Sequence, residues 1–171
     1  MAEINPNLIS ALIKAGLIET AEDATFEALT GGVSSDIWKI ITPERVFCVK
    51  QALSKLKVEA DWYAPVERNE FEVAWDSIAS DVVPGAAPAI LMQDKVGMMF
   101  AMDFLDTNTH KLWKSELRDG RVNILAAEQV GALLAKVHSG TVGDAAVAKQ
   151  FPYSGIFHAI RLEPYLEATA N

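Results

Sequence analysis

A lysine at the end of a short apolar run is the first residue whose position suggests chemistry. Lys50 closes the run 46–50, where strand alternation places Val46, Cys48 and Lys50 on one face. A lysine in that place either extends its charged end to solvent or has a charged partner. Glu72, in a later stretch with a helical pattern, is either that partner or an ordinary solvated helix residue. A lysine held by a helix glutamate can contact the phosphate groups of a nucleotide.

A glycine turn lies upstream of the lysine. Gly31-Gly32 stands between two apolar stretches and is followed by Val33, Ser34 and Ser35. Backbone N–H groups in such a turn can surround phosphate oxygens, because no Cβ blocks a close approach, and the two serines add hydroxyl donors. A Gly-Gly pair between strands is most often just an ordinary hairpin turn. Phosphate binding is therefore indicated by the turn, the lysine and the glutamate together, and by none of them alone.

The third candidate segment lies where the predicted strands give way to helices. Met102, Asp103, Phe104 and Leu105 form it. Free backbone N–H and C=O groups at a strand edge could bind an adenine ring, with Val33, Ile90 and Met102 as apolar neighbours. The alternative is a plain connection between two parts of the chain.

Composition limits the functional classes. The chain has 171 residues, of which 50% are hydrophobic and 22% charged, as expected for one globular domain. A net charge of −8 argues against DNA or RNA as a partner, because phosphate backbones require a basic surface. The three histidines lack the spacing of metal ligands, and a single cysteine cannot form an internal disulfide. No apolar stretch approaches the ~20 residues that span a bilayer, so we expect no membrane contact and a cytoplasmic location.

The pattern of apolar residues predicts an α+β fold. We expect an antiparallel five-stranded sheet with one inserted helix, followed by helices from about residue 106. Gly140 is the expected stop of the helix that begins at Ile124, and 143–154 is expected to be mostly loop. The predicted strands are 26–29, 37–41, 46–50, 89–93 and 96–102, and the predicted helices are 7–18, 65–80, 124–138 and 156–169.

Taken together, these segments resemble the aminoglycoside phosphotransferase-like family, whose members have a protein-kinase-like fold. The resemblance covers nearly the whole chain and is carried by residues 29–38, 46–50, 68–75, 100–105, 130–138 and 158–166. It implies a kinase-like N-lobe over 1–102, a hinge at 103–106 and an incomplete helical C-lobe over 107–171.

The resemblance also implies roles for individual residues. The turn from Gly31 to Ser35 would cover the phosphates of ATP, Lys50 would contact them, and Glu72 would anchor Lys50. The segment from Met102 to Leu105 would line the adenine site. Members of the family transfer the γ-phosphoryl group of ATP to a hydroxyl of a small molecule, and the full-length enzyme uses magnesium.

The chain departs from the family pattern after His138. The family continues with a His-Gly-Asp catalytic loop, an asparagine and a metal-binding aspartate. Here the acidic residues after His138 are Asp144, Glu163 and Glu167, and none stands in that pattern. We therefore expect a family member cut off before its active site, with no catalytic or metal-binding residues of its own.

Three outcomes remain open from the sequence. The first is the nucleotide-binding half of a small-molecule kinase, with a nucleotide and a hydroxylated small molecule as its ligands. The second is a non-catalytic nucleotide-binding or interaction module, which could self-associate through apolar helix surface. The third is a degenerate product with no function.

Overall fold

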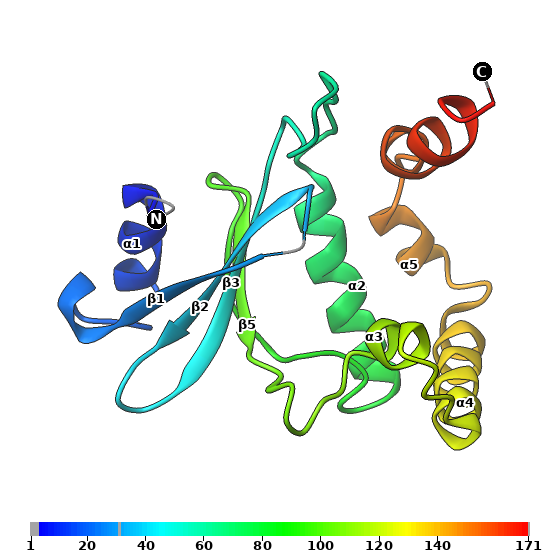
Figure 1. Ribbon diagram of the computed structural model, residues 1–171, viewed down its shortest axis with the longest axis horizontal. Coiled ribbons are helices and arrows are strands. Elements are labelled where there is room, and N and C mark those ends of the chain that lie inside the picture. Colours follow the sequence, from blue (N-terminus) through cyan, green and yellow to red (C-terminus); the bar gives the residue numbers. More distant parts are fainter. Residues whose placement is uncertain (1–3, 31, 171) are drawn as a thin grey trace.

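A five-stranded antiparallel sheet forms the centre of the first hundred residues. The computed structural model describes residues 4–30 and 32–170. The strands lie in the order β1-β2-β3-β5-β4, with helix α1 on one face and α2 on the other (Figure 1). This confirms the predicted α+β class. The strands are β1 (Thr25–Leu29), β2 (Ser35–Ile41), β3 (Val46–Ala52), β4 (Ile90–Asp94) and β5 (Met99–Asp103).

The hydrophobic core lies between the sheet and α1 (Pro6–Lys14). Asn5 caps this helix, because its side chain accepts a hydrogen bond of 3.0 Å from the Asn7 N–H. Phe47 and Val49 of β3 point into this core, as alternation in a strand requires. The buried members of the core are Leu8, Leu12, Ile18, Trp38, Ile40, Phe47, Val49, Met99 and Ala101.

The opposite face of the sheet carries Lys50. Residues paired across antiparallel strands share a face, and Lys50 is paired with Ile37 on one side and Phe100 on the other. Cys48 lies two residues earlier on the same face, as the alternation predicts. Helix α2 (Arg68–Val82) packs on this side, so Lys50 projects from the middle of the sheet toward it.

Helix α2 begins three residues later than Pro65, where the sequence placed its first turn. Its buried residues are Asn69, Val73 and Ala79. Trp75, which the apolar pattern assigned to the buried stripe, is 39% exposed. The face of α2 that contacts the sheet therefore includes Asn69, near the start of the helix, and does not include Trp75.

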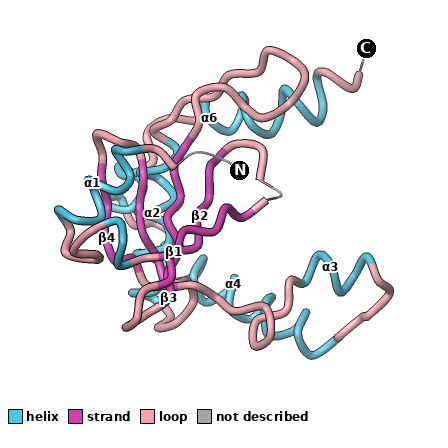
Figure 2. The backbone as a smooth tube through the Cα atoms, turned by 60° about the vertical axis from the view of Figure 1, so that its left-hand side comes forward, coloured by secondary structure: helices cyan, strands magenta, loops and turns pink. Residues whose placement is uncertain are grey.

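The remaining helices lie beyond α2, away from the sheet (Figures 1 and 2). One further short helix, the 3-10 helix η1 (Ala21–Asp23), precedes the first strand of the sheet. The later helices are α3 (Trp113–Arg118), α4 (Ile124–Thr141), α5 (Ala145–Gln150), α6 (Gly155–Phe157) and η2 (His158–Glu167), the last a π-helix.

Two expectations for this region are wrong. Gly140 is not itself the stop of α4, which ends one residue later at Thr141. It lies where the helix passes Val82 of α2, and a Cβ at Gly140 would come within 2.6 Å of the Val82 Cγ1. The expected loop contains α5, because the Asp144 carboxylate accepts from the N–H groups of Ala146 (2.7 Å) and Val147 (3.1 Å) and starts a helix there.

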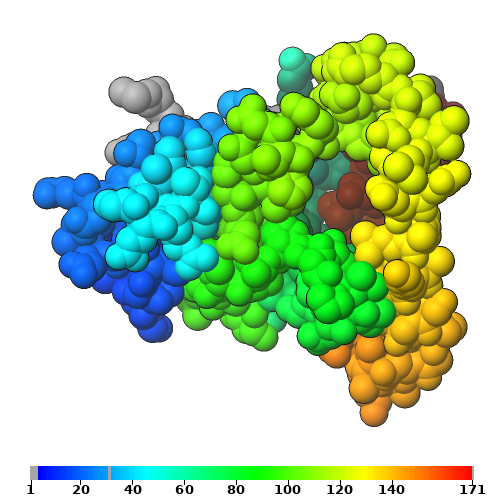
Figure 3. All heavy atoms as spheres, turned by 90° about the horizontal axis from the view of Figure 1, so that it is seen from below, coloured from blue at the N-terminus to red at the C-terminus, as the bar shows by residue number. Residues whose placement is uncertain are grey.

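These later helices bury little apolar surface. Among the described residues after β5, Val137 and Ile156 are the only hydrophobic side chains that are buried. The space-filling view shows the molecule hollowed between its green part and α3 and α4 in yellow, with C-terminal atoms in dark red visible inside (Figure 3). No described helix is both long and apolar enough to span a lipid bilayer.

Candidate functional site

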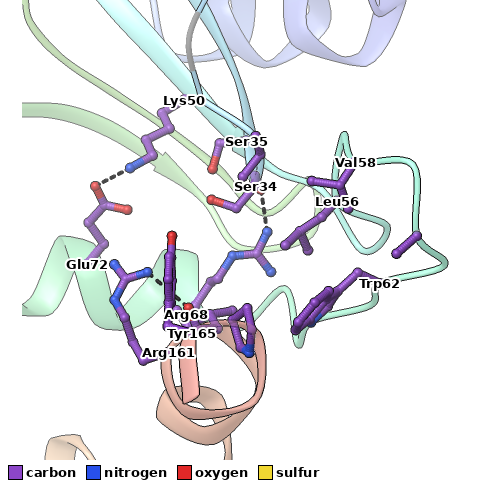
Figure 4. A pocket seen from close by; sticks show the side chains of 14 residues that line it. Ser34, Ser35, Lys50, Leu56, Val58, Trp62, Arg68, Glu72, Arg161 and Tyr165 are labelled. Atoms are coloured by element: carbon purple, nitrogen blue, oxygen red, sulfur yellow. Dashed lines mark hydrogen bonds and ion pairs between the residues drawn. The ribbon is translucent and has the colours of Figure 1, made fainter. Parts of the chain in front are cut away.

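The structure brings the lysine and the glutamate together. Lys50 Nζ and Glu72 Oε1 form an ion pair between β3 and α2 (Figure 4). Both side chains are partly buried, with 21% and 37% of their surface exposed. The predicted pairing of these two residues is confirmed, and Glu72 is not a purely solvated helix residue.

The turn before β2 is held firmly on its C-terminal side. Gly31 lies outside the described residues. The Val33 carbonyl accepts from the Lys57 N–H at 2.8 Å, and the Ser34 carbonyl accepts from the Leu53 N–H at 3.1 Å. The turn is therefore fixed to the segment that follows β3, which brings it close to Lys50 and α2.

Arg68 adds a second connection to the turn that the sequence did not reveal. Its guanidinium donates to the carbonyls of Ser34, of Leu53 (2.7 Å), of Ala64 (3.2 Å) and of Pro65 (2.6 Å). Burial lowers the pKa of Arg68 from its usual value, and the nearby carboxylates of α2 oppose that change. Arg68 therefore positions the turn on the N-terminal end of α2, and its donors are used by the protein itself.

A pocket of about 530 Å³ opens beside these residues, which is a size typical of small-molecule sites. Ser34 and Ser35 reach it from the turn, and neither hydroxyl bonds to another described residue. The backbone N–H groups of Gly32, Val33 and Ser34 donate to no described residue either. The pocket is lined by Val33, Ser34, Ser35, Lys50, Leu56, Val58, Ala60, Trp62, Arg68, Glu72, Ile160, Arg161, Pro164 and Tyr165 (Figure 4).

The charges of the pocket favour an anion. Lys50, Arg68 and Arg161 contribute three positive charges to the lining, and Glu72 contributes one negative charge. This local excess stands out in a chain whose net charge is −8. Cations, hydroxyls and unpaired backbone N–H groups at one place are the donors that bind phosphate or carboxylate oxygens.

Among the residues expected around an adenine ring, Val33 lines this pocket, whereas Ile90 and the segment from Met102 to Leu105 do not. The strand edge expected here is wrong, because β5 lies between β3 and β4: Met102 is paired with Cys48 on one side and with Ile90 on the other. The Asp103 N–H donates to the Ala89 carbonyl at 3.0 Å, and its carboxylate forms an ion pair of 3.3 Å with Arg45. Phe104 lies beneath Lys39, whose Nζ is 5.1 Å from the ring centroid. Leu105 is 45% exposed.

The sheet register nevertheless relates this segment to Lys50. Met102 is opposite Cys48, and Cys48 precedes Lys50 by two residues on the same face. At about 3.3 Å per residue the two positions are about 7 Å apart along the strand. Met102 therefore continues the face of the sheet that leads to the pocket, whereas Asp103, opposite Phe47, belongs to the other face.

Two further titratable groups lie on this side of the sheet. Burial raises the pKa of the Asp76 carboxyl, the negative charge of Glu72 raises it further, and Lys50 opposes both. Burial also raises the pKa of the Cys48 thiol, with Lys39 opposing. A raised pKa disfavours the thiolate, which is the reactive form of a cysteine.

The described residues form no cluster of metal-ligating side chains. Within the part of the chain that the structure describes, no three His, Cys, Asp or Glu side chains gather closely enough to hold a metal ion. Glu72, the carboxylate of the pocket lining, already pairs with Lys50.

Sequence reasoning missed one whole wall of the pocket. Trp62 lines it and donates from Nε1 to the Ala159 carbonyl at 3.0 Å, which joins the segment after β3 to the last helix. Arg161 and Tyr165 of that helix then face Lys50 and Glu72 across the pocket (Figure 4). The spacing of Arg161, Pro164 and Tyr165 places them on one face of a helix. The sequence does not indicate which part of the molecule that face contacts.

Comparison with known proteins adds no assignment. No protein-family model matches the chain, and no curated protein matches its sequence.

Proposed function

We propose that this chain binds ATP, with the phosphate groups in the pocket between the turn and Lys50. In this proposal the chain is the nucleotide-binding part of a small-molecule phosphotransferase with a protein-kinase-like fold, similar to the aminoglycoside phosphotransferase-like family. The observation that carries the proposal is the Lys50–Glu72 ion pair. It lines the same pocket as the hydroxyls of Ser34 and Ser35, which bond to no described residue.

The parts of the pocket have separate tasks in this proposal. Glu72 holds Lys50 in one orientation, so that the ammonium contacts phosphate oxygens at little entropic cost. Gly32, Val33 and Ser34 offer backbone N–H groups that are free of described partners. Ser35 adds a hydroxyl, and Arg68 keeps the turn in place through the Ser34 carbonyl.

The adenine ring would lie toward the segment from Met102 to Leu105. The register gives a continuous face from Lys50 past Cys48 to Met102, and apolar side chains on such a face suit a flat heteroaromatic ring. Phe104 and Leu105 follow directly and would contact the ring from the connection to the helices.

Binding without turnover is the second candidate function, and one observation favours it. Glu72 is the sole carboxylate among the described residues that line the pocket, and Lys50 already neutralises it. Phosphoryl transfer to a hydroxyl requires a group that positions or deprotonates that hydroxyl. A nucleotide-binding module without catalysis satisfies the present geometry equally well.

Calorimetric titration with ATP tests the proposal on the wild type, Lys50→Ala and Lys95→Ala. Lys95 is a matched control, because it also pairs with a glutamate of α2, Glu70, at 3.1 Å, and it lies outside the pocket. Losing a charged donor costs about 1.5–3 kcal/mol, so Lys50→Ala should weaken ATP binding by about tenfold to a hundredfold. Lys95→Ala should bind ATP as the wild type does.

Equal affinity in all three proteins, or no ATP binding by the wild type, contradicts the proposal. An assay for ADP release with small hydroxylated compounds then separates the two candidate functions. Turnover supports the phosphotransferase, and binding without turnover supports the non-catalytic module.

A further inference from the structure

The last helix forms a wall of the pocket. The chain reaches it from α5 through Phe151, whose ring lies 5.9 Å from that of Phe71 in α2, and Trp62 holds it by the hydrogen bond to Ala159. These two contacts fix η2 so that Arg161 and Tyr165 face the side of the pocket that bears Lys50 and Glu72 (Figure 4).

Arg161 differs from the other two cations of the pocket. Lys50 is paired with Glu72, and the Arg68 guanidinium is shared among four carbonyls. Arg161 forms no ion pair with any described carboxylate, and its hydrogen bond of 3.1 Å goes to the carbonyl of the preceding residue, Ile160. A guanidinium has five N–H donors in a planar fork, so most of the donors of Arg161 remain open.

We propose that Arg161 binds an anionic group of the ligand, opposite the turn that carries Ser34 and Ser35. A phosphoryl group suits this place, because its oxygens accept two parallel hydrogen bonds from one guanidinium. With Lys50 on one side and Arg161 on the other, the pocket fits a ligand with two or more linked phosphoryl groups. The identity of that ligand as ATP rests on the proposed function, whereas the anion-binding role of Arg161 does not.

A consequence is that ligand binding holds the last helix against the sheet half of the molecule. The phosphoryl group would bridge Lys50 of β3 and Arg161 of η2, which are otherwise joined only indirectly through Trp62 and α2. A ligand that bridges the two elements makes separation of η2 from the sheet half less frequent while it is bound.

The test compares ATP and inorganic tripolyphosphate by calorimetric titration. The proteins are the wild type, Lys50→Ala, Arg161→Ala, Arg161→Lys and the control Arg118→Ala, whose arginine pairs with Asp119 and lies outside the pocket. Arg161→Ala should weaken binding of both ligands about tenfold with an unchanged melting temperature, since this exposed arginine bonds only to its neighbour's carbonyl. Arg161→Lys should be intermediate because it keeps the charge and loses the fork, and Arg118→Ala should equal the wild type.

The possible outcomes test this inference and the proposed function separately. Wild-type affinity in Arg161→Ala, with ATP binding still dependent on Lys50, overturns the role of Arg161 alone. Tripolyphosphate binding that depends on Arg161, with ATP no tighter and no effect of Lys50→Ala, supports the role of Arg161 and overturns the nucleotide site. Binding of neither ligand by the wild type overturns both.

Discussion

At the scale of single residues, the pocket depends on donors that the protein leaves unpaired. The hydroxyls of Ser34 and Ser35 bond to no described residue, while the Ser34 carbonyl accepts from Leu53 and Arg68. The backbone of the turn is thus fixed through its acceptors, and its donors remain available. This division is what a phosphate-binding turn requires.

Replacing Gly32 by alanine adds one methyl group to that turn and tests whether the turn binds phosphate. A Cβ at Gly32 would meet the Ser35 carbonyl oxygen at 3.8 Å and the Ile37 Cδ1 at 4.0 Å, which are ordinary contacts. Gly32→Ala should therefore change the free energy of unfolding by less than about 0.5 kcal/mol. We expect weaker ATP binding all the same, because a glycine lets a ligand approach the backbone of a turn more closely than a residue with a side chain does. Urea unfolding and ATP titration of the same sample measure both effects, and unchanged affinity would place the phosphates elsewhere.

Asp76 predicts a pH dependence of stability. Its pKa is raised in the folded state, first by burial and then by Glu72, so the folded chain binds this proton more tightly than the unfolded chain does. Stability therefore falls as the pH rises from the ordinary carboxyl range through the raised pKa. Asp76→Asn should stabilise the protein at pH 7 and lose that advantage in acid, where the wild-type carboxyl is protonated in both states. Urea unfolding of both proteins across this pH range checks the sign, and a difference that grows toward acid contradicts it.

At the scale of elements, the contact between α2 and α4 depends on the absence of a side chain. Gly140 lies against Val82, and a Cβ there would come within 2.6 Å of one methyl carbon and 3.1 Å of the other. A Cβ at Gly131, in the same helix, would have no such neighbour within 4 Å. The two glycines are therefore opposite cases within one helix.

Alanine substitutions at these two glycines should change the free energy of unfolding in opposite directions. Gly131→Ala should stabilise the protein by about 0.5–1 kcal/mol, the usual gain from alanine in a helix. Gly140→Ala should destabilise it, because overpacking costs about 1–3 kcal/mol and exceeds that gain. Chemical unfolding measures both, and Val82→Ala combined with Gly140→Ala should recover part of the loss. A stabilising Gly140→Ala would show that the two helices separate easily.

The same elements show how far the sequence could predict the fold. Alternating apolar residues located all five strands and placed Lys50 on the face opposite Phe47 and Val49, because period-two burial is a local property. The pairing of Lys50 with Glu72 was one of two alternatives that the sequence left open, and the structure selects it. The four carbonyls around Arg68 were not predictable, because backbone acceptors leave no mark in the sequence.

Contacts between distant segments account for most of what was missed. Trp62 and Ala159 are 97 residues apart, and the pattern of either segment indicates no partner. Gly140 looked like a helix stop because glycine usually is one, and only its contact with Val82 explains its place inside α4. The expected loop contained α5, whose capping residue, Asp144, could have indicated a helix start.

At the scale of the whole molecule, stability is concentrated in the sheet half. The core of nine buried residues lies between the sheet and α1, whereas Val137 and Ile156 are the only buried hydrophobic residues among those described after β5. The free energy of local opening should follow this distribution, because it scales with the apolar surface that opening exposes.

Hydrogen exchange measures that distribution. Amides of β3 and β5 should exchange most slowly, close to the rate set by global unfolding. Amides of α4 and η2 should exchange faster by opening locally, without unfolding of the sheet. Peptide-resolved exchange over minutes to hours checks this, with α2 as the internal reference because it contacts both halves. Uniform protection across all helices would show that the chain unfolds as a single cooperative unit.

Trp62 gives the pocket an optical signal of its own. Its indole lines the pocket and bonds to Ala159, while Trp38, Trp75 and Trp113 lie outside the lining. Indole emission moves to shorter wavelength when water leaves the ring and to longer wavelength when water enters. A chain with phenylalanine at the other three positions would emit from the pocket alone. Ligand entry would then shift the emission maximum of Trp62 to shorter wavelength, and separation of the last helix would shift it to longer wavelength. No attached dye is needed.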